Sequence, residues 1–98
     1  MHTEFLILVT ASYSDDSTLE LKRSKCSNSR EDIITLINTI KRDYAKAISE
    51  DFFKDEDITL FLRVYELNDY NIPKLVESSS LIKNNSVPSV WTGWSFDL

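Results

Sequence analysis

The chain has 98 residues, of which 42% are hydrophobic and 28% charged, and its formal net charge is −5. This length supplies one hydrophobic core of ordinary size, so we expect a single compact domain over residues 1–98. The negative charge disfavours nucleic acid and anionic membrane surfaces as partners, because both attract basic faces. The single glycine, Gly93, excludes glycine-rich phosphate loops and dinucleotide-binding fingerprints.

Histidine and cysteine each occur once, as His2 and Cys26. One cysteine forms no disulfide within the chain, and a zinc site needs about three or four protein ligands, so we predict no metal and no cofactor. His2 lies next to the terminus, where an imidazole is not held in place for triad chemistry. We therefore predict no catalytic residues and a protein that is not an enzyme, unless a site is assembled between subunits.

The first ten residues carry Glu4 and a short apolar run, without the basic head of a secretory signal. No stretch of the sequence approaches the roughly 20 apolar residues that span a bilayer. We expect a cytoplasmic protein with no membrane partner.

Two strands joined by a turn are predicted in the first quarter of the chain. Residues 4–13 are apolar on both alternating faces, which is typical of an interior strand covered on both sides. Residues 14–17, Ser-Asp-Asp-Ser, are turn formers because their side chains bond to nearby backbone. Residues 18–24 alternate between apolar and polar types, which predicts a half-exposed antiparallel partner strand.

A long amphipathic helix is predicted from about residue 30 to residue 50. Asn28 or Ser29 provides the N-cap, and Glu31 and Asp32 face the positive end of the helix. Apolar residues recur at steps of three and four, namely Ile33, Ile37, Ile40, Tyr44, Ala47 and Ile48. We expect this stripe to cover the sheet.

The second half of the chain begins with an acidic break and then resumes strand character at residues 58–67. A short second helix is predicted after Asn71, with Pro73 in its first turn, although Ser78-Ser79-Ser80 is a poor helix interior. Residues 90–96 form a last strand, with Trp94 and Phe96 on one face and Trp91 on the other.

These elements predict an α+β fold in the order β-β-α-β-(α)-β. The fold is a two-layer sandwich with an antiparallel or mixed sheet of about four strands and one long amphipathic helix. One helix covers one face of the sheet only. Apolar residues assigned to the second face, Phe61, Tyr65, Leu67 and Trp91, then require another cover, so we expect a homodimer or a docked partner there.

Charge and aromatic residues are distributed unevenly. Residues 50–69 carry seven acidic residues against Lys54 and Arg63, and the last eight residues carry Trp91, Trp94 and Phe96. An acidic edge speeds the association of basic partners, and Trp is the commonest anchor of binding hot spots. The partner-binding residues that we predict are Asp51, Asp55, Glu56, Asp57, Trp91, Trp94 and Phe96.

The resulting hypothesis is a non-catalytic acidic module that captures a basic protein partner, as an inhibitor or antagonist. Its size and charge are typical of bacterial immunity proteins that neutralise nuclease toxins and of small phage proteins that block host defence enzymes. This likeness is one of type and is carried by no motif. The alternative hypothesis is an oligomer that binds a small ligand or nucleotide at subunit interfaces, with Lys22, Arg23 and Arg30 as anion contacts.

Overall fold

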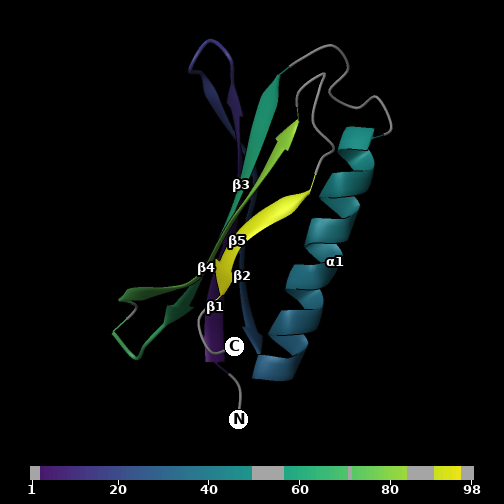
Figure 1. Cartoon of the computed structure of the whole chain (residues 1–98). Coiled ribbons are helices and arrows are strands. Elements are labelled where there is room, and N and C mark those ends of the chain that lie inside the picture. The colour runs from purple at the N-terminus through teal and green to yellow at the C-terminus, as the bar shows by residue number, and fades with distance from the viewer. Residues whose placement is uncertain (1–2, 50–56, 71, 84–89, 96–98) are drawn as a thin grey trace.

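The computed structural model describes residues 3–49, 57–70, 72–83 and 90–95, which form one helix and a five-stranded sheet (Figure 1). The elements are β1 (Thr3–Tyr13), β2 (Thr18–Asn28), α1 (Arg30–Ser49), β3 (Ile58–Leu67), β4 (Pro73–Lys83) and β5 (Trp91–Ser95). The strand order is β2-β1-β3-β4-β5, and every neighbouring pair is antiparallel. The fold is therefore an α+β sandwich, with α1 on one face of the sheet.

The prediction of a short second helix after Asn71 is wrong, because Pro73–Lys83 form β4 and the sheet has five strands rather than about four. A β-bulge in β4 interrupts the alternation of buried and exposed residues by which a strand is predicted. Val64 pairs with Glu77 while Tyr65 pairs with Leu75, which leaves Val76 as the extra residue of β4. Val76 and Glu77 are consecutive and both buried, so the two-residue alternation that identifies a strand is broken.

The strands predicted at residues 4–13 and 58–67 are confirmed as β1 and β3. Their buried side chains alternate on the face toward α1, and they are Phe5, Ile7, Val9, Ala11, Ile58, Leu60, Leu62 and Val64. β2 continues to Asn28, beyond the predicted end at residue 24, because it pairs with β1 along nearly its whole length.

α1 begins where the sequence predicts. The Asp32 backbone N–H donates to the Ser29 hydroxyl oxygen at 3.2 Å, so Ser29 is the N-cap. The helix buries Ile33, Ile37, Ile40 and Ile48 against the sheet. Full burial of such a side chain contributes about 1.5–3 kcal/mol, so this contact is the main source of stability for the pair of layers. Within the described residues, no helix is long and apolar enough to cross a membrane.

Gly93 fixes the path of β5 over β4. Its φ is +151°, in a region that side chains rarely adopt, and a Cβ there would lie 2.2 Å from the Ser78 carbonyl oxygen and 2.6 Å from the Ser79 Cα. Both of these atoms belong to the backbone of β4, so a small rotation of a side chain does not relieve the clash.

We expect Gly93→Ala to lower the free energy of unfolding by about 2–4 kcal/mol, because backbone strain and overpacking act together. Urea unfolding followed by circular dichroism measures the change. Thr92→Ala, at the exposed neighbouring position of β5, is the control and should change the value by less than about 0.5 kcal/mol. Equal stabilities of the two variants would show that β5 does not depend on this close approach.

Candidate functional site

The face of the sheet opposite α1 is the first candidate site. Leu8, Arg63, Ser78 and Trp94 form one row across β1, β3, β4 and β5. Because the alternating buried residues of β1 point toward α1, this row points to the other side. In Figure 1 no described helix or strand lies over that side of the sheet.

Neighbouring rows extend this surface. Leu6 pairs with Tyr65, Thr10 pairs with Phe61, and Thr59 pairs with Ile82. We call the resulting surface the open face, and define it by Leu6, Leu8, Phe61, Arg63, Tyr65, Ile82 and Trp94. Ile82 is 49% exposed and Trp94 45% exposed, and the aliphatic and aromatic residues of β1 and β3 are half-buried by one another.

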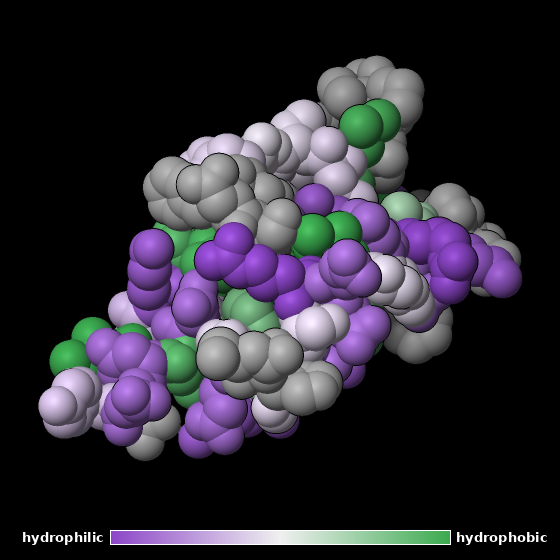
Figure 2. Space-filling view, turned by 90° about the horizontal axis from the view of Figure 1, so that it is seen from below, coloured by the Kyte–Doolittle hydropathy of each residue, from purple (hydrophilic) through white to green (hydrophobic). Residues whose placement is uncertain are grey.

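The surface at the lower end of the strands is more hydrophilic than the open face. Figure 2, seen from below, shows a mainly hydrophilic surface with apolar residues in small separate groups, including one at the β3–β4 turn on the left. The tips of the β1–β2 and β3–β4 hairpins lie at opposite ends of the molecule, on the side away from α1 (Figure 1). They therefore flank the open face at its two ends.

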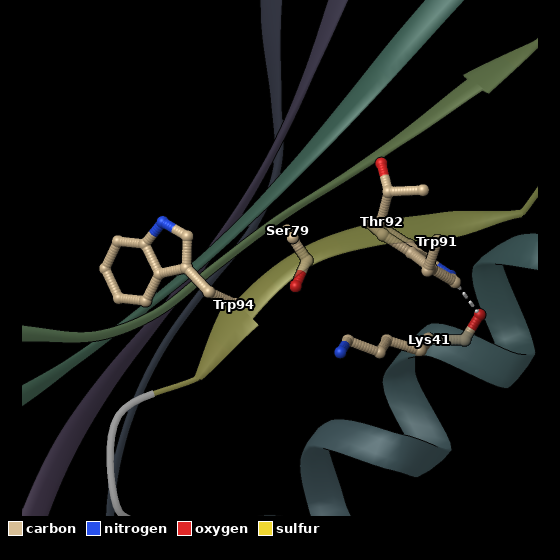
Figure 3. A pocket seen from close by; sticks show the side chains of 6 residues that line it. Lys41, Ser79, Trp91, Thr92 and Trp94 are labelled. Carbon is tan, nitrogen blue, oxygen red and sulfur yellow. Dashed lines mark hydrogen bonds between the residues drawn. The ribbon is translucent and has the colours of Figure 1, made fainter.

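The two tryptophans lie on opposite faces, as the alternation predicts. Figure 3 shows Trp94 pointing away from α1, whereas Trp91 lies on the α1 side. The Trp91 indole N–H donates to the Lys41 carbonyl oxygen at 2.8 Å, and the ring packs against the core. The assignment of Trp91 to the uncovered second face is therefore wrong, while Phe61 and Tyr65 do lie there and Leu67 pairs with Glu4 at its margin.

A buried polar cluster on the α1 side is the second candidate site. Glu77 of β4 is 3% exposed, and its Oε2 lies 3.0 Å from the Lys41 Nζ of α1. The Ser79 hydroxyl donates to the same carboxylate oxygen at 3.3 Å. We call Lys41, Glu77, Ser79 and Trp91 the polar clasp, because together they tie α1 to β4 and β5.

The polar clasp borders a cavity of about 150 Å³ between α1 and β5 (Figure 3). The cavity is lined by Lys41, Ser79, Trp91, Thr92, Gly93 and Trp94. In the clasp the Lys41 ammonium is ion-paired and the Ser79 hydroxyl proton points to a carboxylate. Both side chains are thus directed to the Glu77 carboxylate, so the arrangement serves structure and hydrogen bonding.

Sequence reasoning missed the polar clasp. Glu77 lies in the segment predicted as a second helix, and Lys41 lies outside the apolar stripe of α1. Only the pairing of β4 with β3 brings the two together. The one available signal was Trp91, whose N–H needs a partner when the ring is buried.

The predicted acidic edge is described only in part. Asp51, Asp55, Glu56 and Phe96 lie outside the described residues, while Asp57 is exposed directly before β3. Ile58 pairs with Tyr13, so Asp57 lies at the same end of the sheet as the β1–β2 turn with Asp15 and Asp16. We call Asp15, Asp16 and Asp57 the acidic end.

The carboxylate of Asp15 is held in its ionised form. The Ser17 hydroxyl and the Ser17 backbone N–H both donate to it, the latter at 3.0 Å, and these bonds lower the pKa of Asp15. The acidic end therefore keeps this negative charge under mildly acidic conditions as well as at neutral pH.

The predicted basic cluster is spread along β2 and into α1. Arg23 is exposed and its Nε lies 2.7 Å from Glu20 of the same strand, whereas Lys22 is half-buried. Arg30 is the first residue of α1, after β2 has ended. The structure therefore does not join these three residues into one pocket.

Within the described residues, no group of three or more His, Cys, Asp or Glu side chains is placed to hold a metal ion. No protein-family model, curated protein or solved structure matches this chain.

We expect Lys41→Met to lower the free energy of unfolding by about 2–4 kcal/mol, since it removes the ammonium that compensates the buried Glu77 carboxylate. Adding Glu77→Gln should recover part of the loss, because the amide is neutral. Urea unfolding measures both variants.

The matched control is Arg42→Met, which breaks the exposed ion pair with Asp43 and should cost less than about 1 kcal/mol. If Lys41→Met were no more harmful than this control, the polar clasp would not be a structural tie.

Proposed function

We propose that the chain is a protein-binding module that docks a partner on the open face, and that its negative charge draws in a partner of net positive charge. The observation that carries this proposal is a sheet face that no described helix or strand covers, on which aromatic and aliphatic side chains project from four neighbouring strands. A surface of this kind on a small protein marks an interaction site.

The open face has the dimensions of a small specific interface. Strands lie about 4.8 Å apart and rise about 3.3 Å per residue, so β1, β3 and β4 with ten or eleven residues each and β5 with five present about 600 Å². Side chains and the margins of the face add to this figure, and a standard interface buries about 800 Å² on each partner. The open face is therefore close in size to one side of a standard interface.

The composition of the open face also favours binding over core packing. Trp94 and Phe61 supply aromatic anchors, and Ser78 and Ser80 lie beside them on β4. Interfaces combine such anchors with polar groups that bond to the partner or to water. A rigid antiparallel sheet presents these side chains with little loss of backbone entropy on binding.

Long-range electrostatics supports a basic partner. The chain carries a net charge of −5, and the acidic end places three exposed carboxylates beside one end of the open face. Such a charge raises the association rate with positive proteins. A module that binds tightly and performs no chemistry fits the role of an inhibitor or antagonist of that partner.

Capture from native lysate with identification by mass spectrometry, followed by titration of the purified partner, tests the open face. We expect Trp94→Ala to raise Kd by about 30-fold or more, since it deletes an anchor. Phe61→Asp should abolish binding, because it places a desolvated carboxylate in the contact.

The matched control introduces the same charge elsewhere. Asn38→Asp, on the exposed side of α1, should leave Kd within about threefold of the wild-type value. Circular dichroism verifies that all variants are folded. A partner that binds both open-face variants as tightly as the wild type would refute docking on the open face.

A small-ligand role is the second candidate function, favoured by the cavity beside the polar clasp. Its lining combines the Lys41 ammonium with the Ser79 hydroxyl, which suits a hydroxylated ligand better than an apolar one.

If this second role holds, a nucleotide or sugar present at about 100 times its Kd adds about 2.7 kcal/mol of stability, which raises Tm by about 10 °C or more. A thermal-shift screen of nucleotides and monosaccharides measures this. Ser79→Ala should remove the shift, whereas Ser80→Ala on the opposite side of β4 should keep it. A screen without any shift would argue against a ligand of this class.

A further inference from the structure

We infer that the surface docked on the open face carries an Asp or Glu side chain that pairs with Arg63, surrounded by apolar contacts. This inference rests on the proposed function and specifies the chemistry of the partner. It concerns the contact itself, whereas the acidic end concerns the approach of the partner.

Arg63 occupies the middle of the open face. It lies on β3, the central strand of the five, and is exposed. Leu8 is its neighbour in register on β1 and Ser78 on β4. Phe61 and Tyr65 precede and follow it by two residues on the same side of β3. A partner that covers the apolar residues of the open face therefore also covers Arg63.

The other cations beside the open face already have carboxylate partners. The Arg23 Nε lies 2.7 Å from Glu20, and the Lys25 Nζ lies 3.5 Å from Glu4. The Arg63 guanidinium carbon instead lies 5.4 Å from the centroid of the Phe61 ring. In the part of the chain that the structure describes, no carboxylate lies within ion-pair distance of Arg63.

The Phe61 ring prepares the guanidinium for binding. A cation over an aromatic ring is attracted to it, which restricts the rotamers of the arginine. The five N–H donors of a guanidinium lie in its plane, so their edge remains available to a carboxylate that forms two parallel bonds. Arg63 is therefore partly ordered before the partner arrives.

Docking then demands an acidic group. A guanidinium removed from water beneath an apolar surface loses its hydration, and only a paired carboxylate with good geometry compensates for that loss. A lone positive charge at the centre of the contact thus selects partners that carry Asp or Glu at that point and rejects those that do not.

The same charge argues against a second copy of the chain as the occupant. Two copies related by a twofold axis through the middle of the open face would bring two Arg63 side chains together. Like charges that meet in a desolvated contact are destabilising. A different protein with a local carboxylate fits the surface better.

A net positive partner with a local carboxylate is physically consistent. Screening at physiological ionic strength has a length of about 8 Å, so the summed charge governs the encounter while Arg63 acts only at contact. The two requirements thus apply at different distances.

The experiment titrates the captured partner with variants of the full chain. We expect Arg63→Glu to raise Kd by about 30-fold or more and Arg63→Gln to raise it by about tenfold. Arg63→Lys should bind between wild type and Arg63→Gln, because it keeps the charge and loses the planar fork. Circular dichroism and urea unfolding verify that these exposed substitutions leave the fold intact.

Arg23→Glu is the matched control, since it makes the same charge change in the same row of the sheet at the edge strand β2. It should change Kd by less than about threefold. Substitution of each partner Asp and Glu by Lys should identify one whose variant binds Arg63→Glu better than it binds wild type.

The outcomes separate this inference from the proposed function. If Trp94→Ala and Phe61→Asp weaken binding while Arg63→Glu binds like wild type, the open face is the docking surface but the carboxylate is absent. If neither Trp94→Ala nor Phe61→Asp has an effect, the proposed function itself fails. A dimer in light scattering that Phe61→Asp dissociates would replace the separate partner by a second copy and overturn the inference.

Discussion

The structure depends on the contact between α1 and one face of the sheet. Ile33 and Ile37 of α1 belong to one buried cluster with Phe5 and Val64 of the sheet. A single helix has one apolar stripe, so this contact covers one face, and among the described elements no helix or strand covers the other. β1 and β3 nevertheless carry apolar residues on both faces. The mismatch between one covering helix and two apolar faces produces the open face.

The polar clasp fixes the position of β5 and thereby places Trp94 on the open face. The bond from Trp91 to the Lys41 carbonyl oxygen anchors β5 to α1, and Gly93 lets β5 run against β4. Trp94 follows Trp91 by three positions, an odd offset, so anchoring Trp91 on the α1 side puts Trp94 on the open face. A buried ion pair contributes little net stability but penalises arrangements in which it is broken. Glu77 and Lys41 thus help to fix the position of β5, and with it that of Trp94.

Local periodicity explains which elements were predictable from the sequence. β1, α1 and β3 follow their patterns closely, and the capping residue Ser29 marks the start of the helix. β4 was not predictable because the bulge at Val76 breaks the alternation. The ion pair of Lys41 with Glu77 joins residues far apart in the sequence, which no local pattern reveals. Alternation along the last strand correctly placed the two tryptophans on opposite faces, but it gave Trp91 to the wrong side of the sheet, because the side depends on the contact of β5 with α1.

The edges of the sheet direct a partner to its face. β2 is the long edge strand, and its exposed Arg23 and Lys25 hinder the addition of another strand there. β5 is the other edge strand, and its five residues offer few backbone groups for pairing. Strand addition is therefore unfavourable at both edges, whereas the open face offers apolar side chains and one cation. A partner on the open face is recognised through side-chain contacts rather than through backbone hydrogen bonds. Its affinity is therefore sensitive to single substitutions at the centre of the contact.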